Sequence, residues 1–199
     1  ASPGDPYELE LSERLGTSAS YKEQYAYFYR PSQYTVRGTY QYDHSVGNSF
    51  FERPPFCVRF QPTNSAPEFG FVGIHVKPDD AVHEIDGLFE VYTDLRNRWG
   101  IENFILGGDF NAGCSYVRDQ DWANIRLRTD SSFQWFIGDD ADTNVAATRC
   151  PYDRLVGVGS ALVNRISSPA VFYFNATYGL TESQTREVSD HYPVECVLS

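Results

Sequence analysis

Hydrophobic and polar residues alternate along the first part of the chain, which is the pattern of half-buried β-strands. Residues 21–30 and 33–43 both alternate, and Arg30-Pro31-Ser32 between them has the composition of a turn, so the two segments predict a β-hairpin. A loop is expected over residues 44–55. Two further strands are predicted at residues 56–60 and 69–76, separated by the turn-rich sequence PTNSAPE.

The period of the pattern then changes from that of a strand to that of a helix. Apolar residues recur at helical spacing from Ala81 to Leu95, and Asp79 or Asp80 can cap the helix after Pro78. A short strand is predicted at residues 103–106. Because strand, helix and strand in this order form a crossover unit, the sheet is expected to be mixed and the fold to be of the α/β class.

The rest of the chain predicts further short elements. Residues 122–137 are interpreted as largely helical, and residues 154–163, 171–178 and 191–199 as strands. No repeat, linker or low-complexity segment interrupts the sequence. Residues 1–199 are therefore expected to form a single domain.

Composition narrows the class of protein. Hydrophobic residues make up 41% of the chain and charged residues 22%, which predicts a packed globular domain. The net charge of −11 argues against unaided binding of nucleic acid, so a cation must mediate if the substrate is a phosphate. No apolar run approaches the length of a membrane span, and no membrane partner is expected.

The sequence allows two kinds of covalent modification, N-glycosylation and disulfide formation. Asn175-Ala-Thr is an acceptor pattern for N-glycosylation, which in a secreted protein implies an exposed site. No two of the four cysteines form a CxxC motif, which disfavours a zinc site or a redox pair. Disulfides and buried thiols both remain possible.

The candidate functional residues lie at or near the ends of predicted strands. The segment FILGGDFNAGC places Asp109 and Asn111 beyond a buried strand, where they form either a simple turn or a site for metal or phosphate. Other polar residues at similar positions favour the second reading, because a rigid sheet can collect them at one edge. These residues are Glu23, His75, Asp153, Asp190 and His191.

Several segments together resemble the deoxyribonuclease I family, within the wider endonuclease/exonuclease/phosphatase superfamily. They are GDFNAGCSYV, IRLRTDSSFQW, DADTNVAATRCPYDR and SDHYPVE, with SYKEQYAYFYRP, TYQYD and GIHVKPDDAVHEID upstream. The resemblance implies two packed mixed β-sheets flanked by helices. It also implies a secreted endonuclease that depends on Mg²⁺ or Mn²⁺ and Ca²⁺ and hydrolyses double-stranded DNA to 5′-phosphate products.

The resemblance assigns a role to individual residues. The catalytic set would be His75 with Glu23 and His191 with Asp153, since a carboxylate on one ring nitrogen fixes the imidazole tautomer. The metal ligands would be Asp109, Asn111 and Asp190; the structural calcium ligands Asp142, Thr143, Asn144 and Thr148; and the DNA contacts Tyr21, Arg53, Asn111 and Tyr152. Cys114 and Cys150 would form a disulfide, whereas Cys57 and Cys196 match no bridge of the family and are expected to be buried free thiols, with an additional disulfide between them as the alternative.

The chain also departs from the family pattern. The usual initial strand with an Asn, the following helix, and the strand with a metal-binding Glu have no counterpart, so the fold is expected to be N-terminally incomplete. A separate N-terminal polypeptide of the same protein is the partner that this implies. Pro54 stands where a calcium-binding Glu is usual, and Gly113 replaces a common Asp.

Three functions therefore compete. The first is the metal-dependent nuclease, supported by both histidine–acid pairs. The second is an inactive fragment or degenerate relative that binds a partner such as actin, because Leu9 and Leu11 stand where the family's actin-binding strand lies. A phosphatase for lipids or small molecules is the third, and the matches at the DNA-contact and disulfide positions disfavour it.

Overall fold

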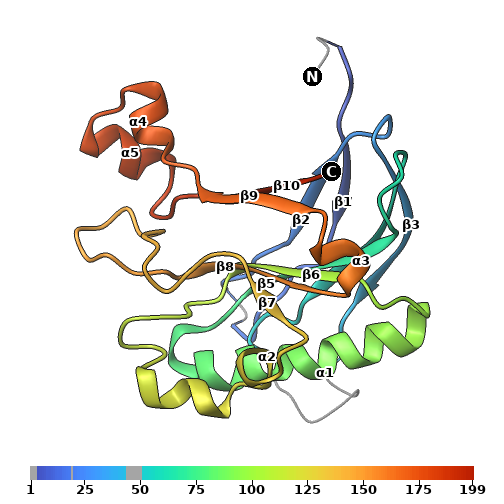
Figure 1. Ribbon diagram of the computed structural model, residues 1–199. Helices are drawn as coiled ribbons and strands as arrows, with labels where there is room; N and C mark the ends of the chain where they lie inside the picture. Colours follow the sequence, from blue (N-terminus) through green and yellow to red (C-terminus); the bar gives the residue numbers. More distant parts are fainter. Residues whose placement is uncertain (1–3, 19, 44–50) are drawn as a thin grey trace.

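The centre of the computed structural model, which describes residues 4–18, 20–43 and 51–199, is a mixed six-stranded sheet (Figure 1). Its strand order is β3 (Tyr34–Gln41), β4 (Phe56–Pro62), β5 (Phe69–His75), β6 (Phe104–Asp109), β8 (Asp153–Val158) and β7 (Gln134–Trp135). Strands β5 and β6 run parallel, and the other neighbours are antiparallel. The predicted crossover unit and the α/β class are thus confirmed, while residues 44–50 of the expected loop lie outside the described residues.

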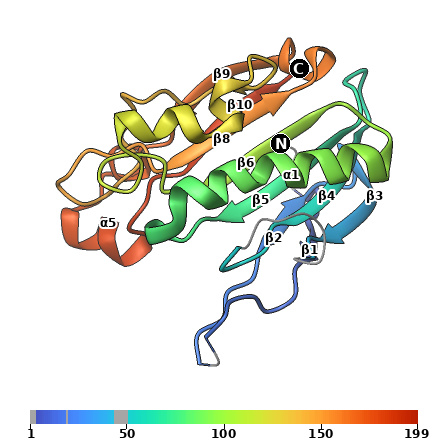
Figure 2. The same ribbon diagram turned by 90° about the horizontal axis from the view of Figure 1, so that it is seen from below.

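The crossover helix covers one face of this sheet. After a short 3₁₀ turn, η1 (Pro78–Asp80), helix α1 (Ala81–Trp99) runs alongside β5 and β6 (Figure 2). Its apolar residues recur at helical spacing and pack against the sheet in one buried cluster, which includes Ile85, Leu88, Val91, Leu95, Val72 and Leu106. The helix ends at Gly100, which adopts a left-handed conformation with φ of 66°.

The opposite face of the sheet carries a second apolar cluster. Two pairs of strands lie over it: β1 (Glu8–Leu11) with β2 (Ala26–Tyr29), and β9 (Ile166–Val171) with β10 (Val194–Leu198). Side chains from both pairs pack on the sheet, among them Tyr27, Tyr29, Val194, Phe60 and Leu155. In the part of the chain that the structure describes, this face therefore carries two separate two-stranded sheets, and the continuous second sheet implied by the resemblance is not seen there.

The hairpin predicted over residues 21–43 is wrong, although both strands exist. Strand β2 pairs with β1, and β3 pairs with β4 in the central sheet. Alternation fixes which residues of a strand face a core, but it does not select the neighbouring strand. Here Tyr27 and Tyr29 form aromatic contacts with Phe60, so β2 lies across the face of the sheet that β3 joins at its edge.

The elements predicted after residue 120 are correct only in part. The segment expected to be helical contains η2 (Asp119–Asn124) and α2 (Arg126–Thr129), but it ends in strand β7. The strand predicted at residues 154–163 gives way to α3 (Ser160–Val163), because Gly159 with φ of 93° turns the chain after β8. The strand predicted at 171–178 is replaced by α4 (Phe174–Tyr178), and α5 (Glu182–Val188) follows it.

Short apolar runs explain these errors, since their periodicity fits a strand or a helix equally well until tertiary contacts decide. Phe174 is buried against Tyr192, which holds the first turn of α4 in place. The final predicted strand is confirmed as β10. Among the described residues, no helix has the length and apolar character needed to cross a membrane.

Candidate active site

Strand register places three of the predicted residues side by side. His75 at the end of β5 pairs with Asp109 at the end of β6, and Asp109 pairs with Asp153 at the start of β8. Paired residues on adjacent strands project from the same face of a sheet. This face is opposite to α1, because Ile74 next to His75 belongs to the cluster beneath that helix.

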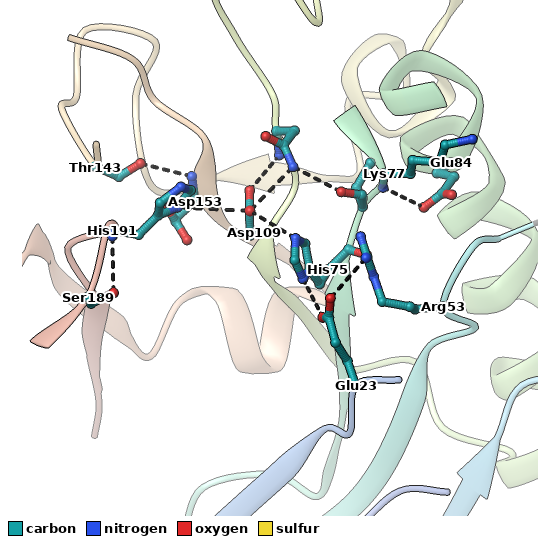
Figure 3. A network of polar contacts seen from close by, with 12 residues as sticks. Glu23, Arg53, His75, Lys77, Glu84, Asp109, Thr143, Asp153, Ser189 and His191 are labelled. Carbon is teal, nitrogen blue, oxygen red and sulfur yellow. Dashed lines mark hydrogen bonds and ion pairs between the residues drawn. The ribbon is translucent and has the colours of Figure 1, made fainter. Parts of the chain in front are cut away.

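His191 reaches the same place from the segment before β10 (Figure 3). Its Nδ1 lies 2.8 Å from Asp153 Oδ2 and 3.9 Å from Asp109 Oδ2. The backbone N–H of His191 donates to Ser189 Oγ at 3.1 Å, and the ring stacks on Tyr152 with 5.7 Å between centroids. The imidazole is thus held by a carboxylate at one ring nitrogen and by an aromatic ring on one face.

Glu23 holds the second imidazole. Its Oε2 lies 2.7 Å from His75 Nδ1, and its Oε1 accepts a hydrogen bond from Arg53 Nη1 at 3.0 Å. Arg53 Nε also donates to the carbonyl oxygen of His75 at 3.0 Å. His75 Nε2 is left 3.4 Å from Asp109 Oδ2, so this ring faces the centre of the site.

Asp109 and Asn111 form a tight turn beyond β6. Asp109 Oδ1 accepts the backbone N–H of Asn111 at 2.8 Å, and Asn111 Nδ2 donates to the carbonyl of Val76 at 2.9 Å. Gly108 makes this approach possible, because its φ is 137° and a Cβ atom there would collide with the carbonyl oxygen of Ile74. The segment GGDFN therefore forms the turn that was one of its two interpretations. The same turn places the Asp109 carboxylate next to both histidines.

The site concentrates charge in a poorly hydrated place. Burial, followed by the nearby Asp153 carboxylate, raises the pKa of Asp109 above its ordinary value. The hydrogen bond that the His191 ring donates to Asp153 is the largest cause that raises the pKa of His191 to about 9, against the opposing effect of burial. This pairing favours the imidazolium form of His191 at neutral pH.

A divalent cation fits this group of side chains. Asp109, Asp153 and His191 each offer a ligand atom, and these atoms lie within 4.8 Å of one another. Two adjacent carboxylates with little solvent around them need a compensating charge, and carboxylate oxygens are the ligands that Mg²⁺ and Mn²⁺ prefer. Since His191 Nδ1 is occupied by Asp153 Oδ2, the hydrogen bond favours His191 as the partner of Asp153 over His191 as a metal ligand through that atom.

The predicted calcium ligands lie together in one loop. Asp142 Oδ1 is 3.3 Å from the backbone nitrogen atoms of Asn144 and Cys150, and Asn144 Nδ2 donates to the carbonyl of Thr148 at 2.8 Å. Thr143 Oγ1 accepts the backbone N–H of Asp153 at 3.0 Å, which couples the loop to the active site. The calcium site itself stays a prediction.

The remaining predicted residues have varied surroundings. Tyr21 is exposed, Asp190 is exposed beside His191, and Arg53 is 9% exposed because it packs beneath His75. The Cys114–Cys150 disulfide is confirmed. Cys57 is a buried free thiol as expected, and Cys196 is free but only half-buried.

Sequence reasoning missed two buried charged residues near the site. Arg154 is fully buried and donates to the carbonyl oxygens of Pro151, Ile137 and Ala112, so it joins three loops. Glu84 in α1 is 1% exposed and accepts two backbone N–H groups. The sequence signal for Arg154 was its place next to Asp153, whereas Glu84 sits on a helix whose charged positions normally face solvent.

Comparison with known proteins assigns this fold to a family of hydrolases. The model of the endonuclease/exonuclease/phosphatase family matches residues 6–191, so the chain belongs to that family. Within the family it is a homologue of deoxyribonuclease I. It is 48% identical over 200 residues to "Deoxyribonuclease-1" of Rattus norvegicus, covering 98% of this chain and 70% of the relative.

A human relative supports the same homology, and a solved structure supports the fold. "Deoxyribonuclease-1" of Homo sapiens is 46% identical over 200 residues, which cover 98% of this chain and 71% of the relative. The crystal structure of a functionally unknown conserved protein from Enterococcus faecalis V583 superposes with a TM-score of 0.65 at 16% identity, over 97% of this chain and 77% of that chain. The second likeness shows the fold alone.

Proposed function

We propose that the chain carries the active site of a metal-dependent endonuclease that hydrolyses phosphodiester bonds of double-stranded DNA and leaves 5′-phosphate ends. The observation that carries this proposal is the meeting of two imidazole–carboxylate pairs, Glu23–His75 and Asp153–His191, on either side of Asp109. Homology to deoxyribonuclease I supports DNA as the substrate class.

The two imidazoles divide the proton transfers. His191 is protonated at neutral pH and can donate a proton to the 3′ oxygen as the P–O3′ bond breaks. His75, with Nδ1 held by Glu23, can accept a proton from the attacking water through Nε2. The water oxygen becomes part of the 5′-phosphate, and the other product is a 3′ hydroxyl group.

Asp109, Asp153 and the predicted ligands Asn111 and Asp190 would hold Mg²⁺ or Mn²⁺ at this place. Such an ion offsets the charge of the phosphate and of the protein, whose net charge is −11. Tyr21, Arg53, Asn111 and Tyr152 are proposed to contact DNA, and the loop with Asp142, Thr143, Asn144 and Thr148 to bind Ca²⁺.

The proposal is tested by incubating supercoiled plasmid with the purified protein in Mg²⁺ and Ca²⁺, in EDTA, and in EDTA followed by excess Mg²⁺. We expect nicking only where the divalent ion is present. The ends are then identified: product strands should be ligatable without a kinase, because they carry 5′-phosphates. Absence of nicking by folded protein in every condition would leave the second function, a binding protein with a nuclease fold.

Actin binding rests on a different surface. Leu9 and Leu11 on β1 are 47% and 50% exposed, and the exposed Phe28 pairs with Leu9. Unpartnered apolar side chains on an edge strand are typical of a protein interface. Co-sedimentation with actin, compared between wild type and Leu9→Lys, would test it; equal binding would exclude this strand.

The resemblance also supports secretion, a complete pair of packed mixed sheets flanked by helices, and a separate N-terminal polypeptide that supplies a metal-binding Glu. The acceptor pattern supports a glycan at Asn175, which is half-buried in α4. Intact-mass analysis of the secreted material would detect both the glycan and an associated peptide. A single unmodified species would refute both.

A further inference from the structure

Glu84 is a buried carboxylate that the chemistry above does not use. It projects from the first turn of α1 and its residue is 1% exposed. Glu84 Oε1 accepts the backbone N–H of Glu52 at 2.8 Å. Its Oε2 accepts the backbone N–H of Lys77 at 3.2 Å (Figure 3). One side chain thus joins two segments that are far apart in the sequence.

Both segments lead directly to the His75 side of the active site. Glu52 precedes Arg53, whose guanidinium donates to Glu23 Oε1 and to the carbonyl oxygen of His75. Lys77 follows His75 by two residues. Glu84 therefore fixes the backbone on both sides of the group that holds the imidazole.

The same segments are tied to the centre of the site. Val76, between His75 and Lys77, accepts a hydrogen bond from Asn111 Nδ2 and donates its N–H to the carbonyl of Asp109 at 2.8 Å. Tyr25 Oη donates to the carbonyl of Arg53 and accepts the N–H of His75, both at 3.0 Å. A displacement of the residue 52 or residue 77 backbone would be passed to His75 through these bonds.

Burial of the Glu84 carboxylate costs solvation free energy. Burial raises the pKa of Glu84 to about 7, in spite of the two N–H donors and the nearby Arg53 that favour its charged form. An apolar residue at this helix position would avoid that cost, but it would leave the N–H groups of the partly buried Glu52 and Lys77 without this acceptor. The arrangement stabilises one geometry of the two segments.

We propose that Glu84 is a positioning residue, which acts through Arg53 and the backbone of residues 76–77 to place the His75 imidazole toward Asp109. The consequence for turnover rests on the proposed nuclease function. The consequence for the geometry of His75 does not, so the two can be tested separately.

The test compares Glu84→Gln with Asp86→Asn. Glutamine has one acceptor oxygen in place of two, so either the Glu52 or the Lys77 N–H loses its partner. Asp86 is the matched control, because it is a partly buried carboxylate of the same helix that accepts the backbone N–H of Arg126 at 2.8 Å and not an N–H of the segments next to His75. Far-ultraviolet circular dichroism confirms that each variant is folded, and Glu84→Asp, which keeps both oxygens on a shorter side chain, replaces Glu84→Gln if that variant fails to fold.

Two measurements follow. The first is the NMR chemical shift of the His75 ring Cε1–H group in the DNA-free and metal-free protein, which should move in Glu84→Gln and stay constant in Asp86→Asn. The second is plasmid-nicking kinetics: a misplaced imidazole should lower kcat by roughly 10- to 100-fold with little change in KM. Asp86→Asn should keep kcat, and Arg53→Lys combined with Glu84→Gln should lower kcat by less than the product of the single effects, because both act through one imidazole.

An unchanged His75 signal in folded Glu84→Gln would overturn the inference, as would equal losses of kcat in Glu84→Gln and Asp86→Asn. If the wild type does not cleave DNA, the proposed function fails, and the NMR comparison alone decides the role of Glu84.

Discussion

Replacement of Asp153 by Asn is expected to change the charge state of His191 at neutral pH. The hydrogen bond to Asp153 is the largest cause of the raised pKa of His191, and burial works in the opposite direction. Without the carboxylate, the imidazolium loses its main support, and its pKa should fall from about 9 toward the ordinary value of 6.5. The variant should therefore carry more neutral imidazole than the wild type at pH 7.5.

The same change has a defined effect on stability. A pKa that rises from 6.5 in the unfolded chain to about 9 in the folded protein corresponds to roughly 3 kcal/mol of unfolding free energy. Because the folded state holds the proton more tightly, this contribution is complete below pH 6.5 and is lost as the pH rises to about 9. Glu84 produces a fall of the same sign between pH 4.5 and about 7. Burial also raises the pKa of the Cys57 thiol, which adds a fall as the pH approaches 9, so the difference between wild type and Asp153→Asn over pH 7 to 9 isolates His191.

The assay is an NMR titration of the His191 ring together with urea unfolding at pH 7 and pH 9. Wild type should lose stability across this interval, and Asp153→Asn should lose much less. Asp190→Asn is the control, since the exposed Asp190 is the smallest of the causes given for the raised pKa. A His191 pKa that stays near 9 in Asp153→Asn, or a flat wild-type stability between pH 7 and 9, would refute the reasoning.

Three further predictions concern the scaffold. Chelation with EGTA should lower the melting temperature of the wild type and have little effect on Asp142→Asn, because an ion that binds only the folded state stabilises that state. Identical wild-type melting curves with and without EGTA would count against calcium binding by this loop. Double substitution of Cys114 and Cys150 with Ser removes a disulfide that spans 36 residues and should lower the unfolding free energy by about 3 to 4 kcal/mol. Urea unfolding measures this loss, with Cys196→Ser as the control, and a loss below about 1 kcal/mol would contradict the prediction. Gly108→Ala should destabilise by more than about 1 kcal/mol, whereas Gly38→Ala, where a Cβ meets nothing within 4 Å, should be tolerated; equal melting temperatures would show that β6 can adjust.

The sequence predicted the parts of the fold that have a strong local signal. Helix α1 follows from the apolar spacing between Ala81 and Leu95, and its position between two strands predicted the parallel pair β5–β6. Strand partners carry no such signal: β2 was assigned to the wrong neighbour because the contacts of Tyr27 and Tyr29 with the central sheet are remote in sequence.

The site, like the fold, was predictable from the sequence only in part. Both histidine–acid pairs could be proposed from motifs, and their polar residues were expected at strand boundaries. The alignment of His75, Asp109 and Asp153 in one row is a property of register, which the sequence alone does not fix. Glu84 was missed because nothing in the sequence distinguishes this buried carboxylate from the solvated ones of the same helix, and Arg154 because its place next to Asp153 does not reveal its burial.

His75 and His191 are both proposed to transfer protons in DNA hydrolysis. The most direct measurement is the initial rate of plasmid nicking in Mg²⁺ and Ca²⁺ by His75→Ala and His191→Ala, with the exposed His83→Ala as control. Each of the first two should be slower by roughly 10²- to 10⁴-fold while remaining folded, and the control should match wild type. Nicking at the wild-type rate by folded His75→Ala or His191→Ala would contradict the account.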